Sequence, residues 1–314
     1  MQNKEYVCTL DERSIRRARE ELNEDPEQRA GAVNALRDWV IQQNWLRFPT
    51  DEVFLLGILR IKKFSQLRAR EYIKSLLTIL QKYPEWYRGN DPADPSIQRV
   101  WQYGVFMPLP KKDQQGRRVV LIRAGRVDPT GASYSLDEYI KANTLIMNYI
   151  MLDEYVQVNG LVMLIDLKDF TMKHQQFFGF ETSRRTREII QNAALARFKE
   201  FHFFNAGLIV ETVFPLMKGF LSQKLQKRIH VHGNNLESLF EKVDMSLLPD
   251  EYLPDDYTGT RVGTAGDILE NVITEMQKSD NRRVISLMHS SEWWIDRKLE
   301  PTHEPQTSYR KLIS

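Results

Sequence analysis

Residues 161–167 read LVMLIDL, a run in which one aspartate interrupts six apolar residues. A strand with one face in water alternates apolar and polar residues, whereas a nearly continuous apolar run is typical of a central strand covered on both faces. Three further short runs rich in β-forming residues, at 119–124, 201–205 and 229–232, are separated by segments with helical spacing. This alternation of strands and helices predicts an α/β domain.

The turn sequence DQQG at residues 113–116 comes directly before the run at 118–123. Aspartate and glycine favour a tight turn, so this run is predicted to belong to a β-hairpin, which makes the predicted sheet mixed. Between the strands, SLDE at 135–138 is a capping box that opens a helix toward Tyr155, and residues 182–199 have the apolar spacing of a second helix.

The N-terminal part has the pattern of helices. TLDE at 9–12 resembles a capping box, Thr50 marks a second helix start, and a third helix is predicted from Ser65 until Pro84 ends it. The stretch RGNDPADPS at 88–96 disfavours regular structure and is predicted to be a linker. The predicted organisation is a helical N-terminal domain at 1–87, this linker, an α/β domain at 97–265, a helical extension at 266–299 and a poorly ordered tail at 300–314.

Composition excludes several classes of protein. The chain of 314 residues is 42% hydrophobic and 27% charged, as in globular domains with a large core. A net charge of +2 cannot support bulk attraction to nucleic acid, and the single cysteine, Cys8, excludes an internal disulfide. No apolar run approaches the roughly 18 residues of a membrane span, and the N-terminus lacks the apolar core of a secretion signal. We therefore expect a cytoplasmic location and, by default, a monomer.

The segment 206–221 is unusually apolar for a helix outside a membrane. The apolar residues that would cover most of its circumference include Leu208, Ile209, Val213, Phe214, Leu216, Met217, Phe220 and Leu221. Such a helix is either buried on all sides, or covers an apolar space on one side and meets a membrane on the other. A plain core helix is the simpler interpretation. Pro215 favours an element that bends or moves, because proline inside a helix costs about 3 kcal/mol.

A resemblance to a known family rests on motifs that follow one another along the chain. They are VFLLGILRIKKF at 53–64, FHFFN at 201–205, KGFL at 218–221, KLQKRIHVHGNN at 224–235 and LPDEY at 248–252. In this order and spacing the chain resembles the CRAL-TRIO lipid-binding family, and within it the tocopherol and retinaldehyde carriers. The resemblance covers roughly residues 30–265.

The resemblance implies a helical N-terminal domain packed on an α/β domain whose apolar cavity holds one small hydrophobic lipid. It makes 206–221 a mobile gate helix and the protein a lipid carrier rather than an enzyme, with no cofactor and no metal. It also implies transient contact with membranes that contain phosphoinositides. The positions that match the family's phosphoinositide-contacting residues are all basic here, namely Lys62, Arg197, Lys199, Lys224 and Arg228. An ordinary solvated basic face is the alternative for these five residues.

Departures from the family pattern narrow the expected cargo. Ala196 stands where members that exchange phosphatidylinositol have an acidic residue, which argues for an apolar, isoprenoid-like cargo such as tocopherol or a retinoid. Gly219 stands where many members have proline, so the resemblance does not predict how rigid the gate helix is.

Other candidate sites carry less weight. His230 and His232 would share one face of a strand and could bind a metal only with a third ligand, which the sequence does not reveal; a buried strand pair is the favoured interpretation. Asp166 and Asp169 suit a strand end that caps the next helix as well as they suit acid/base chemistry. Two other functions are alternatives to the lipid carrier. The first alternative is a lipid-sensing adaptor that recruits a protein partner, and the second is an enzyme acting on the enclosed lipid.

Overall fold

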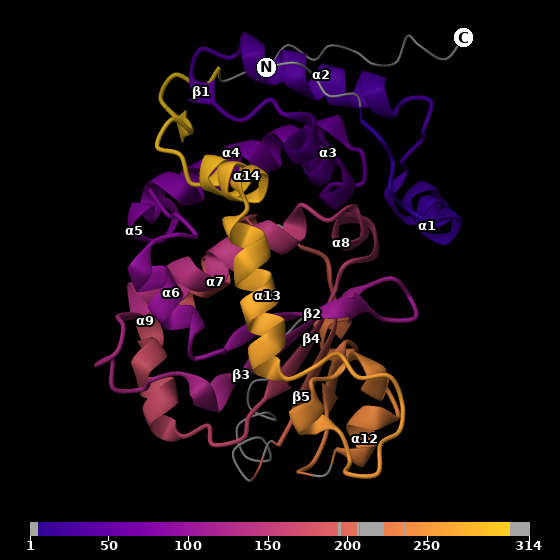
Figure 1. The fold of residues 1–314 in the computed structure, drawn as a ribbon. Coiled ribbons are helices and arrows are strands. Elements are labelled where there is room, and N and C mark those ends of the chain that lie inside the picture. Colours follow the sequence, from indigo (N-terminus) through magenta and orange to yellow (C-terminus); the bar gives the residue numbers. More distant parts are fainter. Residues whose placement is uncertain (1–5, 194–195, 206, 208–222, 235, 302–314) are drawn as a thin grey trace.

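A five-stranded mixed sheet is the centre of the computed structural model, which describes residues 6–193, 196–205, 207, 223–234 and 236–301. The strand order is β2 (Phe106–Lys112), β3 (Arg118–Arg123), β4 (Leu161–Asp166), β5 (Phe198–Phe204) and β6 (Ile229–Val231). β2 and β3 are antiparallel, and all later neighbours are parallel. The predicted mixed α/β class and the predicted hairpin before β3 are both confirmed (Figure 1).

The helices of the described part of the chain surround this sheet. They are α1 (Glu12–Leu22), α2 (Arg29–Gln42), α3 (Glu52–Ile61), α4 (Gln66–Lys82), α5 (Pro84–Tyr87), α6 (Pro95–Trp101), α7 (Leu136–Met151), α8 (Glu154–Asn159), α9 (Met172–Ala193), α11 (Gln223–Gln226), α12 (Glu237–Phe240), α13 (Ala265–Gln277) and α14 (Ser279–Met288). None of the described helices has the length and apolar character needed to cross a membrane.

Capping chemistry explains where several helices begin. Ser135 and Glu138 form the predicted capping box of α7, and Ser65 caps α4 as expected. The predicted box at Thr9 is wrong, because Asp11 caps α1 and the Thr9 hydroxyl donates to Glu154 at 2.8 Å instead. The helix predicted over 182–199 is also wrong at its end, since α9 ends at Ala193 and Phe198 begins β5.

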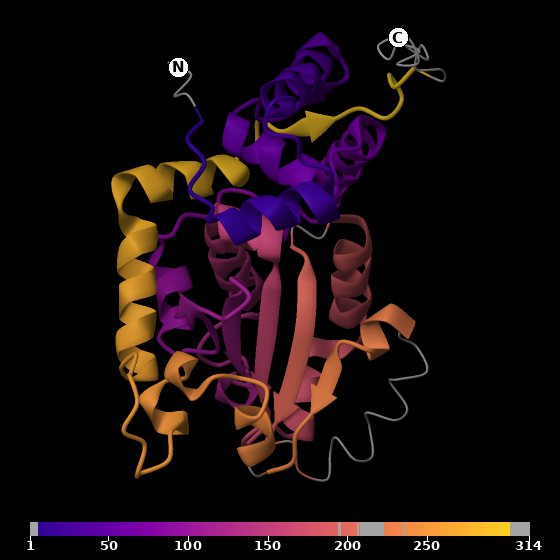
Figure 2. The same cartoon turned by 90° about the vertical axis from the view of Figure 1, so that its right-hand side faces the viewer.

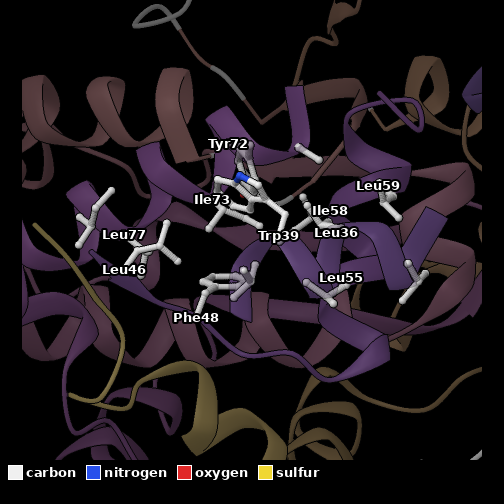
Figure 3. Packing of buried hydrophobic residues seen from close by; sticks show 14 of the residues in the cluster. Leu36, Trp39, Leu46, Phe48, Leu55, Ile58, Leu59, Tyr72, Ile73 and Leu77 are labelled. Atoms are coloured by element: carbon white, nitrogen blue, oxygen red, sulfur yellow. The ribbon is translucent and has the colours of Figure 1, made fainter. Parts of the chain in front are cut away.

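The N-terminal helices share a core of their own. Trp39 of α2, Leu55 of α3 and Ile73 of α4 converge in a cluster that also takes in Leu46 of β1 (Leu46–Arg47) (Figure 3). β1 pairs with β7 (Trp294–Ile295), so a late segment of the chain closes the N-terminal core. Figures 1 and 2 both show these helices above the sheet, with α13 running upward beside the sheet and α14 lying across its upper end, next to them.

Different helices pack against the two faces of the sheet. On one face, Leu121 and Leu164 pack against Leu239 of α12 and Ile268 of α13 in one apolar cluster. On the other face, Met163 packs with residues of α7 and α8. Because successive residues of a strand point to opposite faces, the continuous apolar run of β4 supplies both clusters, as the sequence predicts.

Candidate functional site

An apolar pocket of about 500 Å³ lies on the α7 face of the sheet. The strand register places Phe106 opposite Ile122 and Met163 opposite Phe201, so these side chains form one continuous apolar floor. Pockets of about 300–1,000 Å³ are the usual size for a bound small molecule. This pocket therefore has the position, size and lining of a site for one apolar ligand.

Segments far apart in the sequence complete the walls of the apolar pocket. The N-terminal part contributes Phe48 and Phe54, α9 contributes Ile189, and the C-terminal segment contributes Met288 and Trp293. Trp293 is held in place because its indole nitrogen donates to the carbonyl of Leu287 at 2.6 Å. The N-terminal helices and the C-terminal segment thus line the pocket together with the sheet.

A few polar groups interrupt the apolar lining. Asn143, Thr144 and Asn148 lie on α7, and Thr182 and Thr186 lie on α9, so the two helices present polar groups to one apolar space. Ligand pockets commonly combine an apolar wall with a few placed polar groups that fix the ligand's orientation. The arrangement suits a ligand that is mostly hydrocarbon and carries one polar end.

His289 holds the α7 wall of the pocket from behind. It is 1% exposed, its Nδ1 donates to the carbonyl of Tyr87 at 2.9 Å, and its Nε2 accepts from Asn148 at 2.7 Å. Burial lowers the pKa of His289 to about 4, although the bond to Tyr87 acts in the opposite direction. The imidazole is therefore neutral at neutral pH, in the form that accepts from Asn148.

Acidification is expected to destabilise the fold through His289. Because the pKa of about 4 in the fold lies below the ordinary 6.5, the unfolded chain binds more protons between these values, and stability falls as pH drops from about 6.5 to 4. The full loss is about 3 kcal/mol at 1.36 kcal/mol per pKa unit. Urea unfolding at pH 7 and pH 5 should show a smaller pH effect in His289→Gln than in the wild type; equal pH effects in the two proteins would contradict the assignment.

The basic residues predicted to contact a phosphoinositide gather around the beginning of β5. Arg197 and Lys199 both bind the carboxylate of Glu21 on α1, at 2.7 and 3.1 Å. Arg228 donates to the carbonyl of Phe198, the residue between them, at 2.6 Å. The structure therefore brings three of the five predicted cations together.

The remaining two cations are placed differently. Lys62 ends α3, and its Nζ lies 4.2 Å from the centroid of the Tyr72 ring. The next residue, Lys63, accepts a hydrogen bond from Asn23 just beyond α1, so Lys62 lies near the end of the same helix that carries Glu21. The side chain of Lys224 lies outside the described residues.

Burial and mutual repulsion act on these cations. Burial lowers the pKa of Lys199, and the neighbouring positive charge of Arg197 lowers it further. Burial works to raise the pKa of Glu21, but hydrogen bonds from Arg197 and Lys199 lower it overall. Glu21 is thus an anionic partner for the cluster that the sequence did not identify.

The predicted gate residues lie outside the described part of the chain. These are Leu208, Ile209, Val213, Phe214, Leu216, Met217, Phe220 and Leu221. Their assignment to a gate over the apolar pocket stays a prediction.

Among the remaining candidates, Asp166 has a clear structural role. Asp166 is buried at the end of β4 and accepts from the Tyr252 hydroxyl at 2.7 Å and from the Asn205 amide at 2.8 Å, which ties three segments together. His230 has a neighbour that the sequence did not reveal, because β5 pairs with β6 in a register that sets His202 directly beside it. A pattern of residues within one segment cannot show such cross-strand proximity.

Comparisons with known proteins find a family model, relatives of similar sequence and a solved structure. A family model described as the CRAL/TRIO domain matches residues 102–252. Alpha-tocopherol transfer protein-like of Homo sapiens is 33% identical over 265 residues, which cover 84% of this chain and 73% of the relative. Clavesin-2 of Homo sapiens is 30% identical over 244 residues, covering 77% of this chain and 74% of the relative. The crystal structure of Sfh5 is 14% identical, with a TM-score of 0.47, and covers 79% of this chain and 95% of that one.

Proposed function

The chain belongs to the CRAL/TRIO family, and from this premise we propose that it binds one small hydrophobic lipid in the apolar pocket and carries it between membranes. The observation that carries the proposal is the pocket itself, about 500 Å³ of apolar space on one face of the sheet. The role proposed is binding and transport, with transient attachment to a membrane surface, and not catalysis.

The energetics of lipid transfer explain why a closed pocket is useful. Moving a hydrocarbon chain from a membrane into water costs about 0.8 kcal/mol per methylene, so a long chain leaves a membrane very slowly unaided. A protein that shields the chain from water removes most of this barrier. The aromatic and aliphatic lining of the pocket provides that shielding.

The proposed cargo is an isoprenoid-like lipid with one small polar end, such as tocopherol or a retinoid. Ala196, which replaces the acidic residue of the phosphatidylinositol-exchanging members, lies in the pocket wall and adds apolar surface there. The polar groups of Asn143, Thr144 and Asn148 on α7 offer partners for a hydroxyl or carbonyl group. The name of the alpha-tocopherol transfer protein-like relative supports the same class of cargo.

Vesicle-to-vesicle transfer tests the proposed function. Donor vesicles would carry a fluorescent tocopherol analogue with a non-exchangeable quencher, and the signal would rise as the analogue reaches acceptor vesicles. The expected result is a transfer rate that increases in proportion to the added protein. If neither tocopherol, retinoid, sterol nor carotenoid probes move faster with the protein than without it, the carrier proposal fails.

Release is proposed to be favoured where the basic residues meet a phosphoinositide headgroup. Arg197, Lys199 and Arg228 lie together, and their positive charges suit a phosphate that displaces Glu21. A ligand shifts a conformational equilibrium only by binding one state better, so the headgroup must bind the releasing state preferentially. This mechanism couples delivery to membrane composition.

Reversing the charge at Lys224 and Arg228 together is expected to slow delivery to phosphoinositide-containing acceptors by about tenfold or more, since each cation near an anionic surface contributes about 1 kcal/mol. Cargo binding should be unchanged, because Arg228 is not among the described residues that line the apolar pocket. The measurement is the transfer rate to acceptors with and without phosphatidylinositol bisphosphate.

The matched control for this pair reverses Lys278 and Arg283, two exposed cations that alter net charge by the same amount elsewhere on the surface. Equal delivery rates for the two double variants would rule out a specific headgroup site.

Glu21→Gln should act in the opposite sense and strengthen phosphoinositide binding, because it removes the carboxylate that competes with the headgroup for Arg197 and Lys199.

A further inference from the structure

A cluster of metal-ligating side chains lies on the sheet face opposite the apolar pocket. His202 of β5 pairs in register with Leu164 of β4 and with His230 of β6, and Leu164 belongs to the cluster covered by α12 and α13. Glu200 is two residues before His202 on the same strand, so it points to the same face. The lipid pocket and this cluster therefore share a sheet but not a face.

The geometry of the cluster suits a metal ion. The ligating atoms of Glu200, His202 and His230 all lie within 4.8 Å of one another, and the two imidazole rings stack with centroids 4.7 Å apart. Nε2 of His202 is turned toward the Glu200 carboxylate, 3.3 Å from its Oε2. A shared ion with metal–nitrogen bonds of about 2.0–2.1 Å would require at least one of the two imidazoles to rotate out of the stack, because the lone pair of a ring nitrogen lies in the plane of its ring.

Neighbouring groups already hold these side chains in place. Nδ1 of His202 lies 3.0 Å from Nε2 of His232, whose own Nδ1 lies 3.0 Å from the Ser238 hydroxyl. With a metal on Nε2, His202 would donate its Nδ1 proton to His232, which in turn would donate to Ser238. A ligating histidine usually donates its second nitrogen to a fixed acceptor in this way. Arg117 holds the other side of the Glu200 carboxylate, at 2.8 Å.

We propose that Glu200, His202 and His230 bind a divalent transition-metal ion of the zinc type, leaving a fourth position for water. Two imidazoles and one carboxylate are ligands that zinc accepts, whereas calcium and magnesium prefer all-oxygen sites.

The proposed ion would join two strands of the sheet. β6 is short, Ile229–Val231, and lies at the edge of the sheet, where β5 is its sheet neighbour. An ion held by Glu200 and His202 of β5 and His230 of β6 crosslinks these two strands. Because Arg228 directly precedes β6, the ion would also fix the position of one cation of the basic cluster.

Zinc binding by the full chain, prepared without a histidine tag, tests the site. After dialysis against a chelator and then Zn²⁺, elemental analysis should find one zinc per chain, and competition with a coloured chelator should give a dissociation constant in the micromolar range or tighter. His230→Gln should weaken binding by at least about tenfold, the lower bound expected even for loss of an outer-shell partner. Glu200→Gln, which keeps an oxygen near Arg117, should weaken it as well.

His174→Gln is the matched control, because His174 is a buried histidine bonded to Thr171 and lies outside the cluster. Addition of Co²⁺ should give the visible absorption of a four-coordinate site in the wild type and in His174→Gln, and a much weaker band in His230→Gln and Glu200→Gln. If the wild type retains no zinc, or if His230→Gln binds as tightly as His174→Gln, the proposal is overturned.

Discussion

Replacing Arg60 with methionine is expected to lower the free energy of unfolding by about 3 kcal/mol or more, because it removes a fully buried cation and leaves the buried Glu24 carboxylate with the partly exposed Arg29. The side chains of Arg60 and Glu24 are both 0% exposed. Arg60 binds both oxygens of Glu24 at 2.9 Å and also reaches Glu154 at 2.9 Å and Gln157 at 2.8 Å on α8. One guanidinium thus connects the N-terminal helices to the domain that contains the sheet.

Urea unfolding of three variants measures this effect. Arg29→Met is the matched control, because Arg29 binds the same Glu24 carboxylate at 2.6 Å but is 13% exposed, and it should cost clearly less. The double variant Arg60→Met, Glu24→Met should recover part of the stability that Arg60→Met loses, since no buried carboxylate remains at position 24. If Arg60→Met lowers the free energy of unfolding by less than about 1 kcal/mol, the Arg60–Glu24 pair contributes no more than an ordinary surface ion pair, and the structural role given to Arg60 is contradicted.

Filling the apolar pocket is expected to weaken cargo binding strongly. Thr144 lies on α7 in the pocket wall, so tryptophan at this position would occupy space that the lipid needs. Displacing even a few methylenes costs about 0.8 kcal/mol each, so we expect affinity to fall at least tenfold, and far more for a rigid cargo. Titration with a fluorescent tocopherol analogue measures the change.

The control for Thr144→Trp places the same side chain on the same helix but outside the pocket. Lys141 does not line the pocket, and Lys141→Trp should bind cargo like the wild type. Thermal unfolding of both variants separates loss of binding from loss of fold, because overpacking alone costs about 1–3 kcal/mol. Undiminished binding in a folded Thr144→Trp would mean that the cargo lies elsewhere.

Much of the fold could be predicted because local patterns agree with tertiary structure. Three local patterns predicted elements that the structure contains. They are the apolar run that forms β4, the turn before β3 and the capping box of α7. The hairpin implied a partner strand for β3, but the bounds of β2 were not predicted, because Pro108 and Pro110 disfavour a strand. Prolines are tolerated there since β2 is an edge strand. Phe198 was assigned to a helix because its apolar spacing fits one, but pairing with Leu161 makes it part of β5.

The candidate site was only partly predictable. The basic positions came from family resemblance, and Arg197, Lys199 and Arg228 do lie together, whereas nothing in the sequence pointed to Glu21 as their partner. The pocket wall depends on Trp293, whose sequence position shows no relation to the sheet. Such proximities arise from chain topology, which spacing within a segment does not encode.

Native mass spectrometry of the purified protein, followed by extraction and identification of the bound molecule, shows whether one apolar lipid occupies the pocket. We expect one isoprenoid-like lipid per chain, either carried through purification or captured from a mixed lipid extract, and none in Thr144→Trp. Phosphatidylinositol as the sole bound lipid would contradict the proposed cargo class. A chain that stays empty against every lipid class would contradict the carrier function itself.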